Sequence, residues 1–468
     1  MATADTDVLV VGAGISGLTT AFRLSLRGIN VQVIEAAAHA GGVIQTVRRD
    51  GVLYERGPNS ILETNPHIGE LIDQLELRSQ RIEISARASK RFVVHRGALV
   101  PLPMSPAAFV STPLFSTGAK FRLLREPFAS RRPADSEESV ADFVVRRLGR
   151  EFLDYAVDPF VAGIYAGDPR ELSLPAAFPR LYALEQRYGS LIVGQIRGAH
   201  ERAKRPEKGK NIARSFSFVN GVQTLTDALA ARLERLRLRI RATHIRRGMS
   251  GCLTVATEGN GSSEESRARA VVLAVPARQA ALLVRDFAPG AAQALDAIPY
   301  APVASVASVY RRADVAHALD GFGVLAPRIE QRRILGTLFS STMFEGRAPQ
   351  DHVMLTTFLG GQREPALPSL PDADLANIVH AELAALIGAR AALLSCAVTR
   401  WPHAIPQYTI GHPDRVRTAL TAEDALPGLF LCGSWRGGIS VGDCIASACR
   451  TADRVSDRLQ QAATIRRA

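Results

Sequence analysis

The chain has 468 residues, which is too long for one ordinary domain and predicts two or three. Hydrophobic residues make up 47% and charged residues 22%, a globular composition that excludes a largely disordered protein. The net charge is +12, but 52 of the 57 cationic residues are arginine and no arginine tract is interleaved with aromatic residues, so we expect no nucleic-acid binding.

The cysteines and the N-terminal residues indicate the compartment. The five cysteines are odd in number and lie mostly in apolar runs, which favours a reducing compartment over a disulfide scaffold. Met1–Asp7 lacks the basic and apolar regions of a signal peptide, and no uncharged apolar run reaches 18 residues. We therefore expect a cytoplasmic protein without a membrane-spanning helix.

The first fifty residues follow the order strand, glycine-rich turn, helix, strand. Asp7–Val11 predicts a buried parallel strand, helical periodicity runs from about Ser16 to Arg27 with Gly28 as the left-handed residue behind it, and Val31–Ile34 predicts a second strand. The turn reads Gly12-Ala13-Gly14-Ile15-Ser16-Gly17. This is the G-x-G-x-x-G pattern in the strand–turn–helix context that a dinucleotide-binding fold requires.

Each residue of this pattern has a physical role. Gly12 permits the tight turn, Gly14 lets a pyrophosphate approach the backbone, and Gly17 lets the helix pack closely on the strand. Glu35, 21 residues after Gly14, is placed to accept hydrogen bonds from a ribose, with Ala36 beside it. We expect the whole Gly12–Gly17 turn to contact a dinucleotide cofactor; the less favoured alternative is a βαβ unit that binds no nucleotide.

Two further segments indicate FAD. Gly41 and Gly42 follow Glu35 in a loop where many FAD enzymes place a second glycine pair against the dinucleotide, and Gly57-Pro58-Asn59-Ser60 is a polar turn with a glycine–proline breaker. Together these segments resemble the flavin amine oxidase superfamily, and the second resembles the protoporphyrinogen oxidase family in particular. The resemblance implies that FAD is the cofactor and that both segments contact it.

The cofactor domain is interrupted and resumed. Later segments predict a helix near Gln223–Leu236, a strand ending at Ile245, a hairpin turn over Thr257–Ser263, a buried strand over Ala270–Pro276, a last strand over Leu429–Gly433 and a small-residue helix over Ile445–Leu459. We expect an α/β fold: a discontinuous Rossmann-type FAD-binding domain (residues 1–85, 212–290 and 411–468), a mixed-sheet substrate-binding domain (86–100 and 291–410) and a helical domain (101–211). The helical domain is partly apolar and partly basic, which predicts either a membrane-associating surface or an ordinary solvated subdomain.

The resemblance also implies a substrate site. Lys90-Arg91-Phe92-Val93-Val94 resembles the strand whose arginine holds a substrate propionate, and Asp158–Asp168 resembles the glycine-rich stretch over the macrocycle. Within this stretch, Gly163 either lets its carbonyl approach the macrocycle or is a plain turn glycine. Three apolar strands resemble those that enclose the pyrrole rings, and they imply Leu325, Leu338 and Phe358 as pocket walls. By composition alone these three residues would be read as core.

The last implied contacts belong to the flavin. Ile245 resembles the position that offers its backbone to the adenine, and the segments around Trp401 and Gly438–Cys444 resemble those that border the flavin. The implied contacts there are Trp401, Gly433, Ile439, Ser440 and Val441. The family commonly has asparagine where this chain has Gly442, which puts a side-chain contact at that position in doubt.

The resemblance implies oxidation of protoporphyrinogen IX to protoporphyrin IX in three two-electron steps, with oxygen as acceptor and hydrogen peroxide as product. No histidine, aspartate or glutamate stands out as a general base, and we assign no catalytic residue. We reject a dithiol role for Cys444 and Cys449, because five residues along a helix would place their sulfurs about 140° apart. The resemblance allows a peripheral contact with the cytoplasmic face of the inner membrane and a homodimer.

Three other functions compete with this one. The nearest keeps the fold and the flavin but oxidises coproporphyrinogen III, which carries two more carboxylates and would favour extra cations at the pocket rim. A second is an amine or polyene oxidase, in which Trp401 and Tyr408 would form an aromatic cage. A third is a non-catalytic flavoprotein that acts as a membrane-bound partner.

Overall fold

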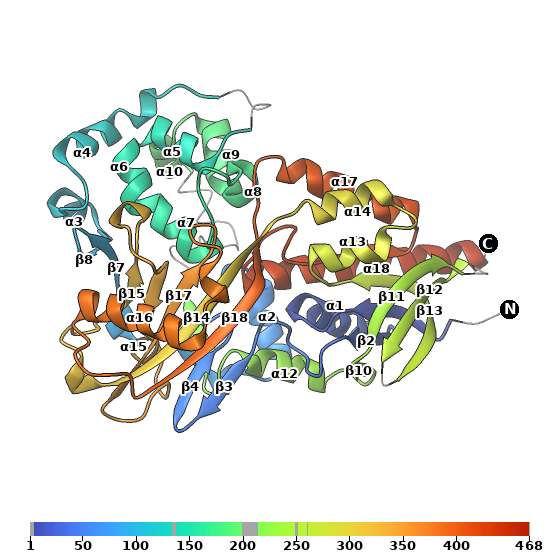
Figure 1. Cartoon of the computed structure of the whole chain (residues 1–468). Helices are drawn as coiled ribbons and strands as arrows, with labels where there is room; N and C mark the ends of the chain where they lie inside the picture. Colours follow the sequence, from blue (N-terminus) through green and yellow to red (C-terminus); the bar gives the residue numbers. More distant parts are fainter. Residues whose placement is uncertain (1–3, 133–136, 199–213, 249–250, 260, 468) are drawn as a thin grey trace.

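The computed structural model describes residues 4–132, 137–198, 214–248, 251–259 and 261–467. Its elements gather in two regions (Figure 1). One region holds both termini, the first strands and the C-terminal helix. The other holds a second sheet with a group of helices above it. Residues 199–211 of the expected helical domain lie outside the described residues.

The first region is built on a sheet of seven strands within the described part of the chain. Five strands are parallel, in the order β10, β2, β1, β13, β19, and β12 and β11 extend β13 as an antiparallel meander. Their bounds are β1 Thr6–Val11, β2 Val31–Glu35, β10 Leu236–Leu238, β11 Arg241–Arg247, β12 Leu253–Gly259, β13 Ser262–Leu273 and β19 Leu429–Leu431. The sheet takes strands from three separate stretches of the chain.

Helices cover both faces of this sheet, because its strands are apolar on both sides. Val8 and Val10 of β1 pack against one set of helices, and Leu9 and Val11 pack against the other. The first set is α1 Ile15–Ser25, α2 Pro66–Gln74, α12 Gln223–Ala231 and α18 Val441–Arg467. The second set is α13 Ala277–Val284, α14 Pro289–Asp296 and α17 His412–Ala425.

The second region contains a mixed sheet with the strand order β18, β14, β17, β16, β15, β7, β8. The bounds are β7 Lys90–His95, β8 Ala98–Pro101, β14 Tyr300–Arg311, β15 Gly321–Leu325, β16 Gly336–Leu338, β17 His352–Gly360 and β18 Ser395–Pro406. Helix α16 (Asp372–Ile387) packs on one face. The short helix α15 (Ser340–Met343) precedes β17.

The helical part packs on the other face of this sheet (Figure 1). Its helices are α3 Pro106–Ser111, α4 Thr117–Leu124, α5 Val140–Arg147, α6 Arg150–Phe152, α7 Asp158–Tyr165, α8 Leu174–Ala177, α9 Pro179–Tyr188 and α10 Leu191–Arg197. Fully buried Arg147 is paired with Glu126 and Glu185, so this buried cation is compensated. In the described residues, no helix is long and apolar enough to cross a bilayer.

Two small sheets join the regions. Strands β3 Thr46–Arg49 and β4 Val52–Glu55 form a hairpin, and β5 Ile61–Leu62, β9 Ser215–Phe218 and β6 Arg81–Glu83 form a three-stranded sheet. The hairpin carries the chain from the second glycine pair to the Gly57–Ser60 turn.

The α/β fold class expected from the sequence is confirmed, but several expected boundaries are wrong. The helix expected to reach Leu236 ends at Ala231, because Leu236 already pairs with Val33 in the parallel sheet. Ile245 lies inside β11 rather than at its end. The turn expected over Thr257–Ser263 is narrower, because the β12–β13 ladder continues as far as the pair Gly259–Ser262.

The ends of two helices also differ from expectation. Helix α1 ends at Ser25, before the expected Arg27, although Gly28 has the expected positive φ of 74°. Helix α18 begins at Val441 rather than Ile445, because the Ser440 hydroxyl accepts a hydrogen bond from the Asp443 amide and caps the helix there. The residue bounds of the three expected domains stay predictions.

Candidate functional site

The Gly12–Gly17 turn lies at the carboxyl ends of the parallel strands. Gly12 has a φ of 102°, and a Cβ on it would come within 2.6 Å of the Ala274 carbonyl oxygen behind β13. A Cβ on Gly17 would overlap the Gly12 carbonyl oxygen. A Cβ on Gly14, in contrast, would point into open space. The turn is therefore tightly packed at Gly12 and Gly17. At Gly14, the residue directly before helix α1, it is open.

The open side is polar. Gly14 is the N-terminal capping residue of α1, and no side chain caps the helix there. The first amide groups of an uncapped helix carry partial positive charge and attract phosphate. Beside them, at the end of β2, the Glu35 carboxylate accepts hydrogen bonds from the amides of Ala13 (2.8 Å) and Ala37 (2.7 Å).

The second glycine pair lies against the first turn. Gly41 forms a parallel bridge with Gly14, and its amide donates to the Ala13 carbonyl at 2.8 Å. A Cβ on Gly42 would lie 3.3 Å from the Gly14 Cα. Gly57 is packed on the same loop, since a Cβ there would overlap the Val43 carbonyl oxygen. Three segments that are far apart in sequence therefore meet at one place.

A fourth segment, the residues from Gly433 to Ser440 that we call the C-terminal loop, closes this edge of the sheet. It follows β19, and a Cβ on Gly433 would lie 3.2 Å from the Val275 carbonyl oxygen, next to the residue that packs behind Gly12. Ile439 packs in a cluster that also contains Leu325. Nearby, the Trp401 indole donates a hydrogen bond of 2.7 Å to the Arg56 carbonyl, directly before Gly57. The loop thus borders both the nucleotide-type turn and the second sheet.

Four neighbouring strands of the second sheet place the expected substrate residues on one face. Residues paired directly across strands point to the same side of a sheet, as do residues two apart along a strand. Two rows result from the register. One is Arg91, Gly323, Leu338 and Thr356, and the other is Val93, Leu325, Gly336 and Phe358. Val93 and Leu325 pack towards the helical part, and Phe358 packs with α7. Leu338 packs towards Met343 and Phe344 instead.

This face is incompletely covered. Leu325, Leu338 and Phe358 are partly exposed, although their strands are central in the sheet and most of their neighbours are buried. Central-strand leucine and phenylalanine are normally fully buried, so partial exposure here indicates a space that is open to solvent. We call this partly exposed apolar face, together with the part of α7 that packs on it, the slot.

Helix α7 packs directly on this face. Gly163 of α7 faces Leu325, and a Cβ on Gly163 would lie 2.7 Å from the Leu325 Cδ2 atom. Asp158, at the start of the helix, accepts hydrogen bonds from the Arg328 amide (2.8 Å) and from the Arg363 guanidinium (2.7 Å). Asp168, beyond its end, accepts one from the Arg328 guanidinium at 3.0 Å. Both ends of α7 are thus attached to residues that follow β15 and β17.

The charged residues around the slot differ in whether they form ion pairs. Burial raises the pKa of Asp168, but hydrogen bonds from Arg170 and the charge of Arg328 outweigh it and lower the pKa overall. Asp168 therefore stays ionised and pairs with both arginines. Arg91 is different: its guanidinium lies over the Phe322 ring, 5.5 Å from the centroid, and no carboxylate of the described residues forms an ion pair with it.

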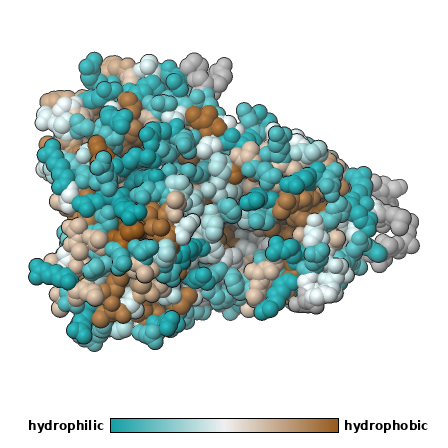
Figure 2. All heavy atoms as spheres, viewed as in Figure 1, coloured by the Kyte–Doolittle hydropathy of each residue, from teal (hydrophilic) through white to brown (hydrophobic). Residues whose placement is uncertain are grey.

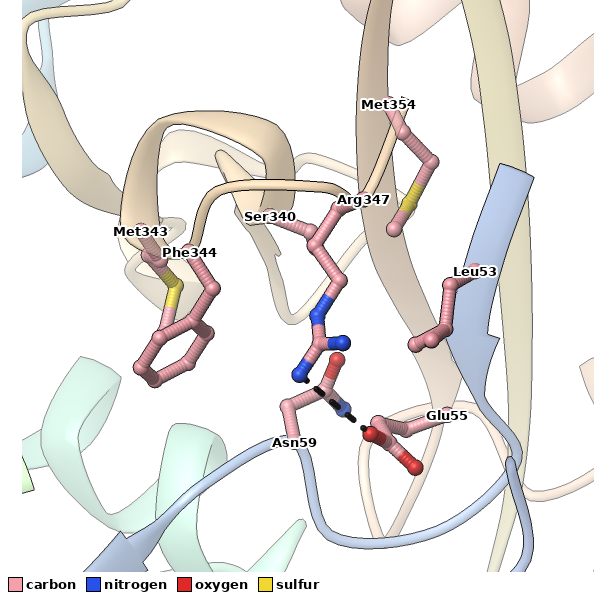
Figure 3. A pocket seen from close by; sticks show the side chains of 8 residues that line it. All are labelled: Leu53, Glu55, Asn59, Ser340, Met343, Phe344, Arg347 and Met354. Atoms are coloured by element: carbon pink, nitrogen blue, oxygen red, sulfur yellow. Dashed lines mark ion pairs between the residues drawn. The ribbon is translucent and has the colours of Figure 1, made fainter. Parts of the chain in front are cut away.

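A buried cluster connects the Gly57–Ser60 turn to the second sheet, and its residues come from β4, the turn, α15, the segment between α15 and β17, and the start of β17 (Figure 3). The Arg347 guanidinium, 2% exposed, lies 3.7 Å from the Glu55 carboxylate and donates to the Ser217 hydroxyl at 2.7 Å. Burial raises the pKa of Glu55 and lowers the pKa of Arg347. Asn59 and Arg347 line a cavity with room for a single water molecule.

Comparison with known proteins decides the family. The family model for flavin-containing amine oxidoreductases matches residues 15–456. The mitochondrial protoporphyrinogen oxidase of Nicotiana tabacum is 36% identical over 486 residues, covering 98% of this chain and 96% of that protein. This chain belongs to the flavin-containing amine oxidoreductase family. A crystal structure of a putative protoporphyrinogen oxidase from Exiguobacterium sp. 255-15 matches this flavoenzyme with a TM-score of 0.80 and 26% identity, covering 98% of this chain and 100% of that one.

Two bacterial relatives are named coproporphyrinogen III oxidase. The coproporphyrinogen III oxidase of Bacillus subtilis (strain 168) is 28% identical, covering 94% of this chain and 95% of that protein. The coproporphyrinogen III oxidase of Propionibacterium freudenreichii is 30% identical, covering 96% and 90%. The flavoenzyme is an FAD-dependent oxidoreductase of the porphyrin pathway.

The residues at the first sheet fit FAD. The open side of Gly14 and the uncapped start of α1 offer room and amide groups to a pyrophosphate, and the Glu35 carboxylate has lone pairs left for a ribose. Trp401 lies beside the Gly57–Ser60 turn through its hydrogen bond to the Arg56 carbonyl, and the C-terminal loop lies at the same edge of the sheet as the Gly12–Gly17 turn. Ile245 is farther along the same region, in the edge strand β11, with its side chain buried.

The structure brings the expected glycine-turn residues and Glu35 together at the first sheet, and it places Leu325 and Phe358 against α7. It does not bring Ile245 to the glycine turns, and Leu338 packs away from α7. Sequence reasoning missed Glu55, Arg347 and Phe322. Glu55 stands only two residues before Gly57, so its place in the motif was the available signal. Arg347 reaches the cluster from a distant segment, and neither its spacing nor its neighbours in sequence indicate this.

Proposed function

We propose that this flavoenzyme oxidises protoporphyrinogen IX to protoporphyrin IX. Plant relatives with that name are 32–36% identical and align with 97–98% of this chain. The observation that carries the proposal is the slot, which has apolar side chains on the sheet and on α7 and a cation, Arg91, that pairs with no carboxylate of the described residues and stands in the same row as Leu338. A flat apolar macrocycle with propionate side chains matches that chemistry.

In this proposal each part of the slot has its own role in substrate binding. Leu325, Leu338 and Phe358 contact the pyrrole rings, and Gly163 lets α7 lie close to Leu325, because a Cβ there would come within 2.7 Å of the Leu325 Cδ2 atom. Arg91 pairs with one propionate, for which its planar guanidinium is suited. We propose as cofactor contacts the residues expected from the sequence, from the Gly12–Gly17 turn to the C-terminal loop.

The protein orients the carbon that loses hydride and keeps water out of the slot, while bound FAD accepts the electrons. Three two-electron oxidations complete the conversion. We propose oxygen as the acceptor, so that each step releases one hydrogen peroxide. This scheme needs no general base among the described side chains, and we assign none.

The coproporphyrinogen alternative is favoured by the two bacterial relatives. That substrate has four carboxylates and would require further cations at the rim. Of the arginines that follow β15 and β17, Arg328 pairs with Asp168, and Arg363 pairs with Asp158. These pairs consume the cations nearest to α7 and favour the substrate with two carboxylates.

The geometry argues against an amine oxidase with a Trp401–Tyr408 cage. Tyr408 is 2% exposed, and its hydroxyl donates to the Ser434 carbonyl at 2.5 Å. The Trp401 indole is held by the Arg56 carbonyl. Because Tyr408 does not face an open space, the two rings do not enclose a substrate amine.

We further propose a peripheral membrane contact through residues 104–128, which we call the apolar patch. On the face seen in Figure 2, hydrophobic residues form separate patches on a mostly hydrophilic surface. Five large apolar side chains of the apolar patch are exposed: Met104 (64%), Val110 (73%), Phe121 (65%), Leu124 (68%) and Phe128 (88%). Exposed Arg122 and Arg125 lie among them. Apolar and basic side chains together suit an anionic lipid surface on the cytoplasmic side.

The experiment that tests the substrate is anaerobic mixing of the FAD-loaded enzyme with protoporphyrinogen IX and, separately, with coproporphyrinogen III, followed by flavin absorbance. Fast bleaching by the first and slow bleaching by the second supports the proposal. The reverse order assigns the enzyme to coproporphyrinogen III. Bleaching by neither substrate in correctly loaded enzyme refutes both.

A further inference from the structure

Tyr408 lies beneath the C-terminal loop and joins its two sides. Its hydroxyl donates to the Ser434 carbonyl at 2.5 Å and accepts a hydrogen bond of 3.1 Å from the Gly438 amide. The residue lies two positions after the end of β18, in a different part of the chain from the loop. One buried hydroxyl thus satisfies a carbonyl and an amide that are four residues apart in the loop.

His412 supports the same loop from α17. Its ring stacks on Tyr408 with the centroids 4.2 Å apart and an interplanar angle of 14°. Its Nε2 atom lies 3.0 Å from the Trp435 carbonyl, and since a carbonyl only accepts, Nε2 is the donor. The stacked pair therefore holds the loop at three backbone positions, in residues 434, 435 and 438.

The loop needs such support because its glycines allow many backbone conformations. Gly433, Gly437 and Gly438 have φ values of 152°, 81° and 122°. Glycine adopts these conformations readily but also populates many others, so the sequence of the loop does not by itself select one shape. The described hydrogen bonds from Tyr408 and His412 select it.

The protonation states are consistent with this task. Burial raises the pKa of Tyr408 well above its ordinary value, so the hydroxyl remains a donor. Burial and the charge of Arg415 lower the pKa of His412 to about 4, so the ring is neutral near pH 7. A neutral ring that donates from Nε2 carries no proton on Nδ1, in agreement with the absence of a partner for Nδ1 among the described residues.

We propose that Tyr408 and His412 are positioning residues that pre-shape the C-terminal loop for the flavin. The proposal rests on the assignment of this loop to FAD but not on the identity of the porphyrinogen. Since Ile439 packs in the same cluster as Leu325, the shape of the loop also affects the part of the slot next to Leu325. Neither side chain needs to touch the reacting atoms.

The test compares Tyr408→Phe with Tyr310→Phe as a matched control. Tyr310 is also buried, and its hydroxyl bonds to His380, on the face of the second sheet that packs on α16. FAD affinity of the apoprotein, visible circular dichroism of the bound flavin and thermal stability are measured for both. We expect Tyr408→Phe to bind FAD about ten-fold more weakly and to change the flavin dichroism, while Tyr310→Phe stays within about two-fold of the parent.

Two outcomes overturn the proposal. One is unchanged FAD affinity and dichroism in Tyr408→Phe; the other is an equal loss in Tyr310→Phe, which would indicate general destabilisation. If Tyr408→Phe does not fold, His412→Phe serves instead, because it keeps the ring stack but removes the donor to Trp435, and the same expectation applies. No measurement uses a porphyrinogen, so an incorrect substrate assignment leaves the result interpretable.

Discussion

The substitution Gly163→Ala tests the slot with one methyl group. The added Cβ would lie 2.7 Å from the Leu325 Cδ2 atom, which is closer than two carbon atoms approach without a shift. The contacted atom is the end of a flexible side chain, so Leu325 rotates away from α7 at little cost to the fold. Alanine is also a better helix former than glycine, which offsets part of that cost by about 0.5–1 kcal/mol.

The rotated leucine enters the slot and narrows it. Overpacking by one methyl group costs about 1–3 kcal/mol in a well-packed site, which corresponds to a rise in KM of about 5- to 150-fold. We expect this rise with protoporphyrinogen IX while Tm and FAD affinity stay near those of the parent. The double variant Gly163→Ala/Leu325→Ala should recover part of the lost affinity, because the displaced side chain is removed.

Gly194→Ala is the matched control. Gly194 also lies in a helix, α10, and a Cβ on it would lie 2.9 Å from a leucine Cδ2 atom, that of Leu184. Steady-state kinetics on the three variants and the parent measure the effect. An unchanged KM in Gly163→Ala, or an equal rise in Gly194→Ala, would show that the substrate does not lie between α7 and the sheet.

Three further predictions concern the anion, the cofactor and pH. Arg91→Ala should weaken substrate binding by about 1.5–3 kcal/mol, seen as a higher KM with FAD affinity unchanged, and an unchanged KM would remove the propionate contact. Gly17→Ala should abolish FAD binding, because its Cβ overlaps the Gly12 carbonyl; a normally loaded flavin in this variant would show that the turn relaxes freely. His412 has a pKa of about 4 in the fold against an ordinary 6.5, so the unfolded chain takes up the proton first and stability falls as pH drops from about 6.5 to about 4, by at most about 3 kcal/mol. Denaturation of parent and His412→Gln across this range should show a shallower fall in the variant, and parallel curves would contradict the assignment.

Local sequence was sufficient wherever the chemistry depends on neighbouring residues. The Gly12–Gly17 turn, the helix after it and the acid at Glu35 were all expected in their observed order, because strand, glycines and helix are adjacent in the chain. Helix and strand ends were less certain. Leu236 continues a helical pattern, but its pairing with Val33 in the sheet outweighs that preference.

The slot was expected only through family resemblance. From periodicity alone, Leu325, Leu338 and Phe358 are indistinguishable from core residues, since strands buried on both faces show the same apolar pattern. The register across β7, β15, β16 and β17 decides which of them share a face, and the position of α7 decides that this face is partly open. Neither the register of these strands nor the position of α7 depends on residues close in sequence.

The sequence by itself therefore determined the fold class and the dinucleotide turn, because these follow from short-range spacing of glycine, apolar and acidic residues. The family was indicated by the resemblance of its motifs to those of known flavoenzymes. Only the tertiary structure decided that Arg347 faces Glu55 and that Tyr408 shapes the C-terminal loop. Those contacts join segments that are separated by as many as 292 positions in one case and by 30 or fewer in the other. The physical reason is that a buried polar side chain must find its partners in space, wherever the packing of the sheets and helices places them.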